Sequence, residues 1–361
     1  MNARTPRERF SDKQQKKLIM KADEYFGLDK LPRKKAVIFE FGPVKEINTG
    51  VFNSGKKEEI DEAIAKGNII IANHDLVEGM SEDHWRFLMA MHEGGMRVPL
   101  TLIRINHPAI GNTVMPIGSE MPAQSALWVH KLKFDEAGNY YGHRGEGISF
   151  VKVENIRDAD RIMPKHMGEF YQQLVVPPDD YIRDVRVYVA GNKIVPGYIR
   201  KAIKPLTKGN YSGLFLPTRD QFVTAEHPGE ILPIEGELKS KVVAEAQKAR
   251  EILVNRIKQR RKDLVGQDLF AFGSIDFLLD AKGEPVINEF DVSPTIRNDF
   301  NLPEKLAREM SEYLIEKAGK NKAIHVYGYS EHPFIRALVQ LLKKKLPANR
   351  VIRKEPLHTT V

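Results

Sequence analysis

The sequence lacks cysteine altogether. Disulfides, thiol nucleophiles and cysteine-ligated zinc sites are therefore excluded, and a reducing, cytoplasmic location is expected. No apolar run approaches the roughly 20 residues that span a bilayer, and no apolar segment of the signal-peptide type follows the basic N-terminus, so no membrane association is expected. A G-x-S-x-G motif is also missing, because residues 328–332 read GYSEH.

Length and charge set the next limits. The 361 residues suit two or three domains, and a hydrophobic content of 42% excludes global disorder. The net charge is +8, and residues 1–35 hold 11 Lys/Arg against 5 Asp/Glu, so this segment contributes 11 − 5 = +6. We interpret it as a solvated leading helix. A nucleic-acid arm is the alternative, and it predicts salt-dependent binding that is lost when residues 1–20 are deleted.

The first hundred residues alternate between short apolar runs and amphipathic segments. This pattern predicts a parallel α/β layer. The expected order is strand 36–42, helix 56–67, strand 68–75, helix 81–95 and strand 97–104. Residues 105–125 are rich in Pro, Gly and Asn and are expected to form a long connection.

The remainder of the chain predicts further strands and helices. Expected strands are 126–134, 148–153, 181–190 and 194–203; expected helices are 236–264 and 302–319; a strand–helix–strand tail covers 323–355. The glycine-rich loop at 142–147 leads to a strand, so it is either a phosphate-cradling loop or a plain hairpin loop. Cations on the strands 181–190 and 194–203 suit an anionic ligand, or else face solvent.

The hairpin from Gly273 to Asp291 carries the most specific pattern. Pairing Asp280 with Pro285 across the turn (280 + 285 = 565) places Asp276 opposite Glu289 (276 + 289 = 565) and Asp291 on the same face. The other face is expected to be core, with Ile275, Phe277, Leu279, Val286 and Phe290. Directly opposed acids are destabilising unless a cation lies between them. The acids therefore either bind a divalent cation or face water.

The order of these pieces resembles the ATP-grasp superfamily over roughly residues 95–320. Lys131, the loop GHRGEG (142–147), DVR (184–186), RK (200–201), IDFLL (275–279) and NEFDVSPTIR (288–297) carry the resemblance. It is similar most of all to prokaryotic glutathione synthetase and the ribosomal-protein glutamate ligases. The stretch SPTIR (293–297) is one residue shorter than the SPTxIR of glutathione synthetase.

The resemblance implies roles for individual residues. It implies Mg²⁺ (or Mn²⁺) ligands at Asp276, Glu289 and Asp291, although the family usually has Asn at the last position. It implies ATP contacts at Lys131 or its neighbour Lys133, at a glycine flap over the phosphates and at a linker that holds adenine; these are Gly142, Gly145, Gly147, Gln172, Gln173, Leu174, Val175 and Lys201. It implies catalytic or substrate-contacting cations at Arg186, Arg200 and Arg297.

The resemblance also implies an overall organisation and an activity. The fold class is α/β (α+β), in which an N-terminal parallel layer precedes two subdomains that sandwich ATP. The expected boundaries are 1–105, 106–178 with the flap, 179–320 with the magnesium site, and 321–361 as an extension that either completes the first sheet or mediates homo-oligomeric assembly. The implied reaction joins a carboxylate to an amine of an amino acid or peptide through an acyl-phosphate. A kinase on the same fold is the alternative.

Overall fold

The computed structural model describes a defined part of the chain. The described residues are 36–41, 67, 69–71, 84–107, 111–118, 127–131, 148–153, 162–165, 169–175, 177, 179–206, 214–215, 219–221, 223, 228–260, 270–291, 294–327 and 331–354. The helix predicted over 56–67 lies outside these ranges, apart from its last residue.

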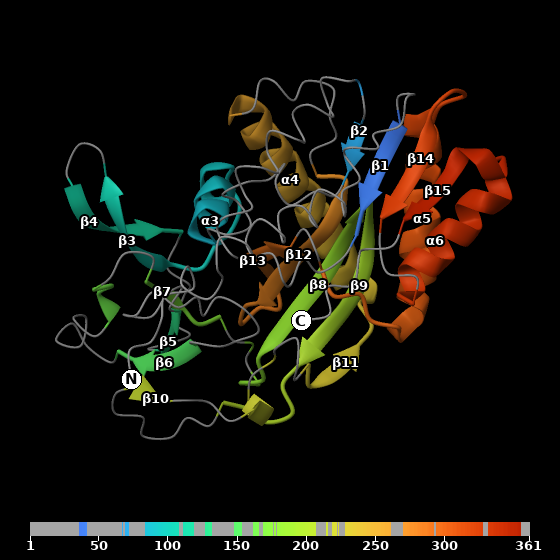
Figure 1. Ribbon diagram of the computed structural model, residues 1–361. Helices are drawn as coiled ribbons and strands as arrows, with labels where there is room; N and C mark the ends of the chain where they lie inside the picture. Colours follow the sequence, from blue (N-terminus) through green and yellow to red (C-terminus); the bar gives the residue numbers. More distant parts are fainter. Residues whose placement is uncertain are drawn as a thin grey trace, which may run out of the picture.

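A four-stranded parallel sheet combines two strands from early in the described chain with two from late in it (Figure 1). Its order is β15 (Val351–Lys354), β14 (Ala323–Tyr327), β1 (Ala36–Glu40) and β2 (Ile69–Ile71). Strand β1 pairs with β2 on one side and with β14 on the other, all in parallel. The C-terminal strand–helix–strand therefore completes the N-terminal sheet, which is the first of the two alternatives given for residues 321–361.

The second sheet has six strands and is antiparallel in every pairing. Its order is β10 (Leu214–Phe215), β6 (Ile148–Lys152), β5 (Leu127–Lys131), β7 (Phe170–Gln173), β3 (Thr101–His107) and β4 (Gly111–Ile117).

Two predictions about β3 and β4 are wrong. Strand β3 was expected in the parallel layer, and β4 was expected to be a connection. The register shows why: β3 and β4 form a hairpin from Thr101–Ile117 to His107–Gly111, which the Pro, Gly and Asn content of residues 105–125 concealed.

The third sheet has five strands, again antiparallel, and lies at the centre of the molecule (Figure 1). Its order is β11 (Glu230–Leu232), β9 (Lys193–Lys201), β8 (Arg183–Ala190), β12 (Phe272–Leu279) and β13 (Pro285–Asp291). A parallel layer followed by two antiparallel sheets is the layer order that the ATP-grasp resemblance implied.

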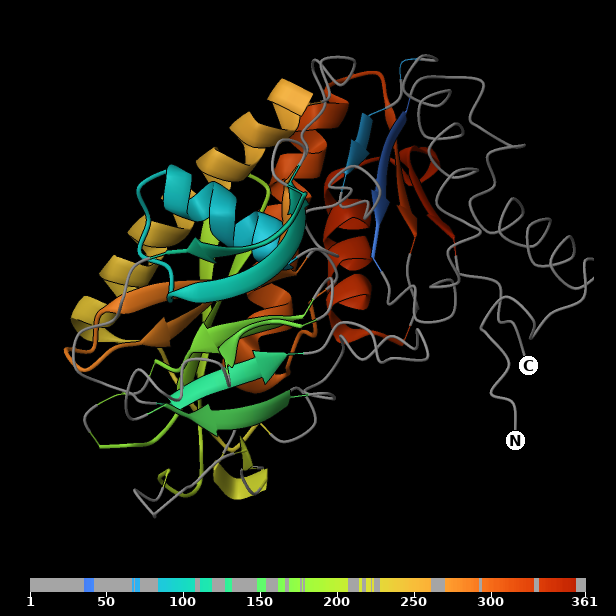
Figure 2. The same ribbon diagram turned by 90° about the vertical axis from the view of Figure 1, so that its left-hand side faces the viewer.

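Helices cover this central sheet on both faces (Figure 2). The helices are α3 (His84–Glu93), α4 (Gly236–Arg260), α5 (Leu302–Ala318) and α6 (Pro333–Lys345), with short 3-10 turns at Arg219–Gln221, Asp299–Asn301 and Ala348–Arg350. Helices α3 and α4 pack on one face in one apolar core, and α5 lies between the other face and the parallel sheet in a second core. No helix in the described ranges combines the length and apolar character of a membrane span.

The hairpin β12–β13 departs from the predicted register near its turn. Leu279 pairs with Pro285, and Asp280 donates its N–H to the carbonyl oxygen of Glu284 at 3.0 Å, so the predicted pairing of Asp280 with Pro285 is wrong. A β-bulge between Asp276 and Phe277 then adds one residue on β13 and restores the predicted pairing of Asp276 with Glu289.

The bulge also moves one residue to the other face. Ile287 belongs to the helix-covered core, whereas Val286 packs with Leu278 and Val175 on the opposite face. Val286 is buried as predicted, but the prediction that it shares a face with Ile275 and Phe277 is wrong, because it assumed unbroken alternation along β13.

Candidate active site

Three rows of side chains cross the face of the central sheet opposite α3 and α4. Each row runs from β13 through β12 and β8 to β9. Successive rows are two residues apart on β12 and β8, and a bulge makes one step three residues on each of β13 and β9. The rows are Asp291–Ser274–Tyr188–Val195, Glu289–Asp276–Arg186–Tyr198 and Val286–Leu278–Asp184–Arg200. Since a strand rises about 3.3 Å per residue, neighbouring rows are about 6.6 Å apart. Charged groups of both signs are thus concentrated in a small area of one sheet face.

Four charged side chains at the centre of these rows form a buried network. Arg186 donates to Asp276 from Nε (2.8 Å) and from one terminal nitrogen (2.6 Å). Arg200 donates in the same bidentate manner to Asp184, at 3.2 and 2.5 Å, and lies 3.6 Å from Asp276. All four residues are at least 93% buried. Because two cations meet two anions, the network is electrically neutral.

Burial and pairing act in opposite directions on these groups. Burial alone would lower the pKa of Arg186, but the adjacent Asp276 carboxylate raises that pKa well above its usual value. Burial raises the pKa of Asp184, and the Arg200 guanidinium only partly offsets this effect. Burial would also lower the pKa of Arg200, but the Asp184 carboxylate raises it above its usual value. Both arginines therefore stay charged and held in fixed geometry, as recognition of a phosphate or carboxylate requires.

The loop that follows β13 lies over the same face. The Tyr188 hydroxyl donates to the backbone carbonyl of Thr295 at 2.7 Å. Arg297 lies 6.0 Å from the ring centroid of Tyr198 and donates to Asp299 at 2.7 Å. Arg297 therefore lies beside Tyr198, which pairs across the strands with Arg186.

The predicted adenine linker runs from the second sheet to the third. Gln172 and Gln173 are buried at the end of β7, and the Gln173 N–H donates to the carbonyl of Leu100 at 2.8 Å. Leu174 joins an apolar cluster with Val129 of β5 and with Ile182, which directly precedes β8. Val175, next along the chain, packs against Leu278 and Val286 at the outermost of the three rows.

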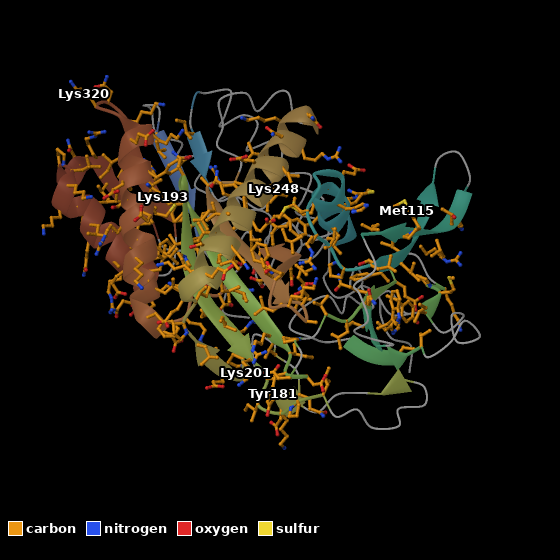
Figure 3. The ribbon with its side chains drawn as sticks, turned by 180° about the vertical axis from the view of Figure 1, so that it is seen from behind. Met115, Tyr181, Lys193, Lys201, Lys248 and Lys320 are labelled. Carbon is orange, nitrogen blue, oxygen red and sulfur yellow. The ribbon has the colours of Figure 1, made fainter. Side chains whose placement is uncertain are left out.

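The remaining predicted cations have different positions. Lys131 is the last residue of β5 and pairs with Ile148 and Phe170. Lys201 ends β9, lies 3.6 Å from Glu230 and sits 4.8 Å above the ring of Tyr181 (Figure 3). The other predicted phosphate contacts, Lys133, Gly142, Gly145 and Gly147, lie outside the described residues.

The three predicted metal ligands differ in their surroundings. Asp276 is 1% exposed and engaged by arginine, Glu289 is exposed, and Asp291 is half-buried. Among the described residues no group of three acidic or histidine side chains converges as a metal site. Two carboxylates are nevertheless sufficient for Mg²⁺, which takes one or two from the protein and completes its shell with water and phosphate oxygens. Glu289 and Asp291 therefore fit such a cation.

Two further polar groups on this hairpin were not predicted. Within the part of the chain that the structure describes, the buried Oγ of Ser274 and Oδ1 of Asn288 have no hydrogen-bond partner. Ser274 pairs across the strands with Asp291, and Asn288 directly precedes Glu289. The signal in the sequence was the position of Asn288 at the start of the NEFD stretch, which the assumed regular register treated as an ordinary strand residue.

Comparison with known proteins yields likenesses of structure only. No family model and no curated protein matches the sequence. The D-alanine–D-alanine ligase of Bacillus anthracis is similar with a TM-score of 0.44 and 11% identity, covering 82% of this chain and 85% of that chain. The ATP-grasp ligase PsnB, in complex with a precursor variant, Mg and ADP, is similar at 0.39 and 15%, covering 71% and 67%. The VanG D-Ala:D-Ser ligase of Enterococcus faecalis is similar at 0.38 and 14%, covering 73% and 69%.

Proposed function

We propose that this chain is an ATP-dependent ligase that joins a carboxylate to an amine and releases ADP and phosphate. The supporting observation is the buried network of Arg186, Asp276, Arg200 and Asp184 beside the acids of β13. An anionic substrate is matched by the two preorganised guanidinium groups, and a divalent cation by the acids. The resemblance of the sequence to the ATP-grasp superfamily, and within it to glutathione synthetase and the glutamate ligases, supports this reaction class.

The chain's own residues have the following roles in this proposal. The linker Gln172–Val175 holds adenine between its backbone and the apolar contact of Val175 with Leu278 and Val286. Lys131 and Lys201, with Lys133 and the glycines of 142–147, bind the phosphates. Mg²⁺, when bound, neutralises phosphate charge and orients the γ-phosphate for transfer. Arg200 and Arg186 stabilise the charge that spreads over the transferred phosphoryl group.

Two chemical steps complete the reaction. A substrate carboxylate oxygen attacks the γ-phosphorus, the bond to the bridging oxygen of ADP breaks, and an acyl-phosphate forms. The lone pair of the amine then attacks the acyl carbon, phosphate leaves, and the amine loses a proton. Arg297, at the edge of the network, is positioned to hold a substrate carboxylate. An amino acid or a peptide provides both reacting groups.

The decisive test is Glu289→Gln, with Glu284→Gln as its matched control. Both glutamates lie on the same hairpin, but Glu284 is in the turn and pairs with Lys241 at 2.6 Å. ADP release is measured with pairs of amino acids and small peptides, and mass spectrometry identifies the product. We expect the first variant to lose turnover at least about a hundredfold, because it loses a metal ligand. Unchanged turnover in Glu289→Gln would refute the assignment.

The product separates the ligase from the kinase alternative. An amide together with free phosphate supports ligation. A stable phosphorylated acceptor without amide formation supports phosphotransfer on the same scaffold.

A further inference from the structure

Glu169 connects three segments at one end of the second sheet. Its carboxylate accepts a hydrogen bond from the backbone N–H of Lys165 at 2.6 Å and lies 2.7 Å from Nε2 of His130 on β5. It also accepts a longer bond, at 3.4 Å, from the Tyr171 hydroxyl on β7. The residue is 5% exposed. Because a buried carboxylate is costly without its partners, these contacts hold the three segments at fixed distances from one another.

The register places Glu169 diagonally across from His130. Strands β5 and β7 are antiparallel neighbours, in which His130 pairs with Tyr171 and Lys131 pairs with Phe170 (Figure 1). Glu169 directly precedes β7 and lies two residues from Tyr171, so it shares a face with Tyr171 and His130. The contact between Glu169 and His130 therefore spans the pair formed by Lys131 and Phe170, which is the last pair of β5.

The two faces of this sheet have different surroundings. Val129 packs with Ile182, which directly precedes β8, a strand of the charged network. Alternation along β5 places Lys131 on the face of Val129, and His130 with Glu169 on the other face. Glu169 is therefore separated from the charged network by the sheet itself. It can affect a ligand at that network through the strands that it holds.

The end of a strand is where such a connection has most effect. Strand ends open more readily than strand centres, because fewer neighbouring contacts hold them. Lys131 is the last residue of β5. A lysine binds phosphate as a point charge on a flexible stem, and the attraction weakens as the distance grows. The position of the β5 end therefore determines how closely the ammonium group of Lys131 can approach a phosphate.

We propose that Glu169 is a positioning residue: through His130 it holds the end of β5 and thereby places Lys131 against the phosphates of the nucleotide. This inference rests on the proposed function, in which Lys131 binds those phosphates. It gives a role to a buried acid on the face of the sheet opposite the ligand.

The first test compares ligands with and without phosphates. Binding of a fluorescent ADP in the presence of Mg²⁺ is measured by anisotropy with the full-length protein, and adenosine is measured by competition. We expect Glu169→Ala to weaken ADP about fivefold or more, which is within the range measured for coupled neighbours, and to leave adenosine within about twofold. Equal weakening of both ligands would indicate a general loosening of the sheet and would overturn the proposal, as would unchanged ADP binding.

Two further variants separate the placement of Lys131 from the stability of the sheet. Arg104→Met is the matched control, because Arg104 connects β3 to the same segment by a 2.7 Å bond to the carbonyl of Pro164. It should lower the thermal midpoint but keep ADP affinity within about twofold. Glu169→Gln keeps an oxygen for the backbone N–H and an N–H group for a neutral His130 ring, so it should retain most of the affinity. An Arg104→Met variant that loses ADP as Glu169→Ala does would contradict the proposal.

A double-variant cycle tests whether Glu169 acts through Lys131. Lys131→Ala alone should weaken ADP about tenfold or more, because it removes a charged hydrogen-bond donor. On that background, Glu169→Ala should weaken ADP by no more than about twofold, since the side chain that it places is already gone. Losses that multiply in the double variant would show that Glu169 acts independently of Lys131.

The outcomes distinguish this inference from the proposed function. If wild type binds Mg²⁺·ADP and Lys131→Ala weakens that binding while Glu169→Ala does not, only the role of Glu169 is refuted. If wild type does not bind Mg²⁺·ADP, the proposed function fails together with the inference.

Discussion

At the residue scale, the charges of the site are ordered before any ligand binds. Arg200 and Asp184 hold each other bidentately in a region where both are 7% exposed. Removing one member of a buried pair leaves the other charge without compensation, which is far more costly than removing both. The stability of the folded site therefore depends on both members of each ion pair, and substitution of one member alone tests this dependence.

We predict that Arg200→Gln lowers the free energy of unfolding by about 3–5 kcal/mol, because it leaves Asp184 buried without its main cation. The double variant Arg200→Gln/Asp184→Asn should recover most of that loss. Urea denaturation of wild type and the three variants measures both effects. A double variant as unstable as Arg200→Gln alone would contradict the paired-charge explanation.

A second residue-scale prediction concerns Tyr171 and pH. Burial, together with the nearby Glu169 carboxylate, raises the pKa of Tyr171 from 10.0 to about 12. The unfolded chain therefore loses this proton near pH 10 while the folded chain retains it, so the stabilising contribution is complete below pH 10 and is lost as pH rises toward 12. Denaturation at pH 9, 10, 11 and 12 should show a smaller loss of stability in Tyr171→Phe than in wild type. Equal losses would refute this assignment, since Phe keeps the ring that stacks on His130 at 4.4 Å.

At the element scale, two bulges flank the row that contains Arg186 and Asp276. One lies on β13 at Asn288, and the other lies on β9, where Gly197 falls between the residues that pair with Arg186 and Val187. A Cβ at Gly197 would come within 2.5 Å of the Arg186 carbonyl oxygen. The strands therefore bend on both sides of the charged network, and a glycine permits the close approach on one of them.

The turns at Gly191 and Gly283 differ in how closely other parts of the protein pack against them, and substitution of each glycine by alanine tests this difference. Gly191 and Gly283 both have a positive φ, but a Cβ at Gly191 would lie 2.5 Å from Tyr313 Cβ on α5, whereas Gly283 has open space. We expect Gly283→Ala to cost about 1–2 kcal/mol from the left-handed backbone alone. Gly191→Ala should cost about 1–3 kcal/mol more, because α5 must shift. Thermal denaturation compares the two, and equal costs would contradict the packing argument.

Most strands of the central sheet were predicted from the sequence, but the changes of register between them were not. Alternation along β8 and β12 and the pairing of Asp276 with Glu289 were accessible from pattern alone. The bulge at Asn288 was not, since one added residue changes the face of Val286 without leaving any mark in the hydrophobic pattern. The β3–β4 hairpin was missed for a related reason: an exposed, proline-containing edge strand resembles a loop. Pairings between distant segments, such as Arg186 with Asp276, depend on strand order and not on local sequence.

At the scale of the whole molecule, the two ends of the chain share one sheet. Strand β14 lies between β1 and β15, and α6 packs beside α5 in the core behind them. The extension is thus part of the sheet that begins the fold, and its removal would leave β1 paired with β2 alone.

We predict that truncation after Lys320 lowers the thermal midpoint by at least about 5 °C and exposes apolar surface, because Phe334, Leu338 and Leu342 leave the core. Binding of the dye ANS and the melting temperature report both effects. Truncation after Lys354 is the control and should leave both unchanged. Wild-type stability in the shorter chain would refute a structural role for the extension.

The pairing of β1 with β14 also has a consequence for biosynthesis. Ala36 pairs with Ala323, so 323 − 36 = 287 residues separate them along the chain. A ribosome that adds about 5–20 residues per second needs roughly 15–60 seconds between the two. The strand β1 therefore leaves the exit tunnel long before its neighbour β14 exists. Both antiparallel sheets can assemble during that interval, so the layer whose first strand is translated earliest is the last to be completed.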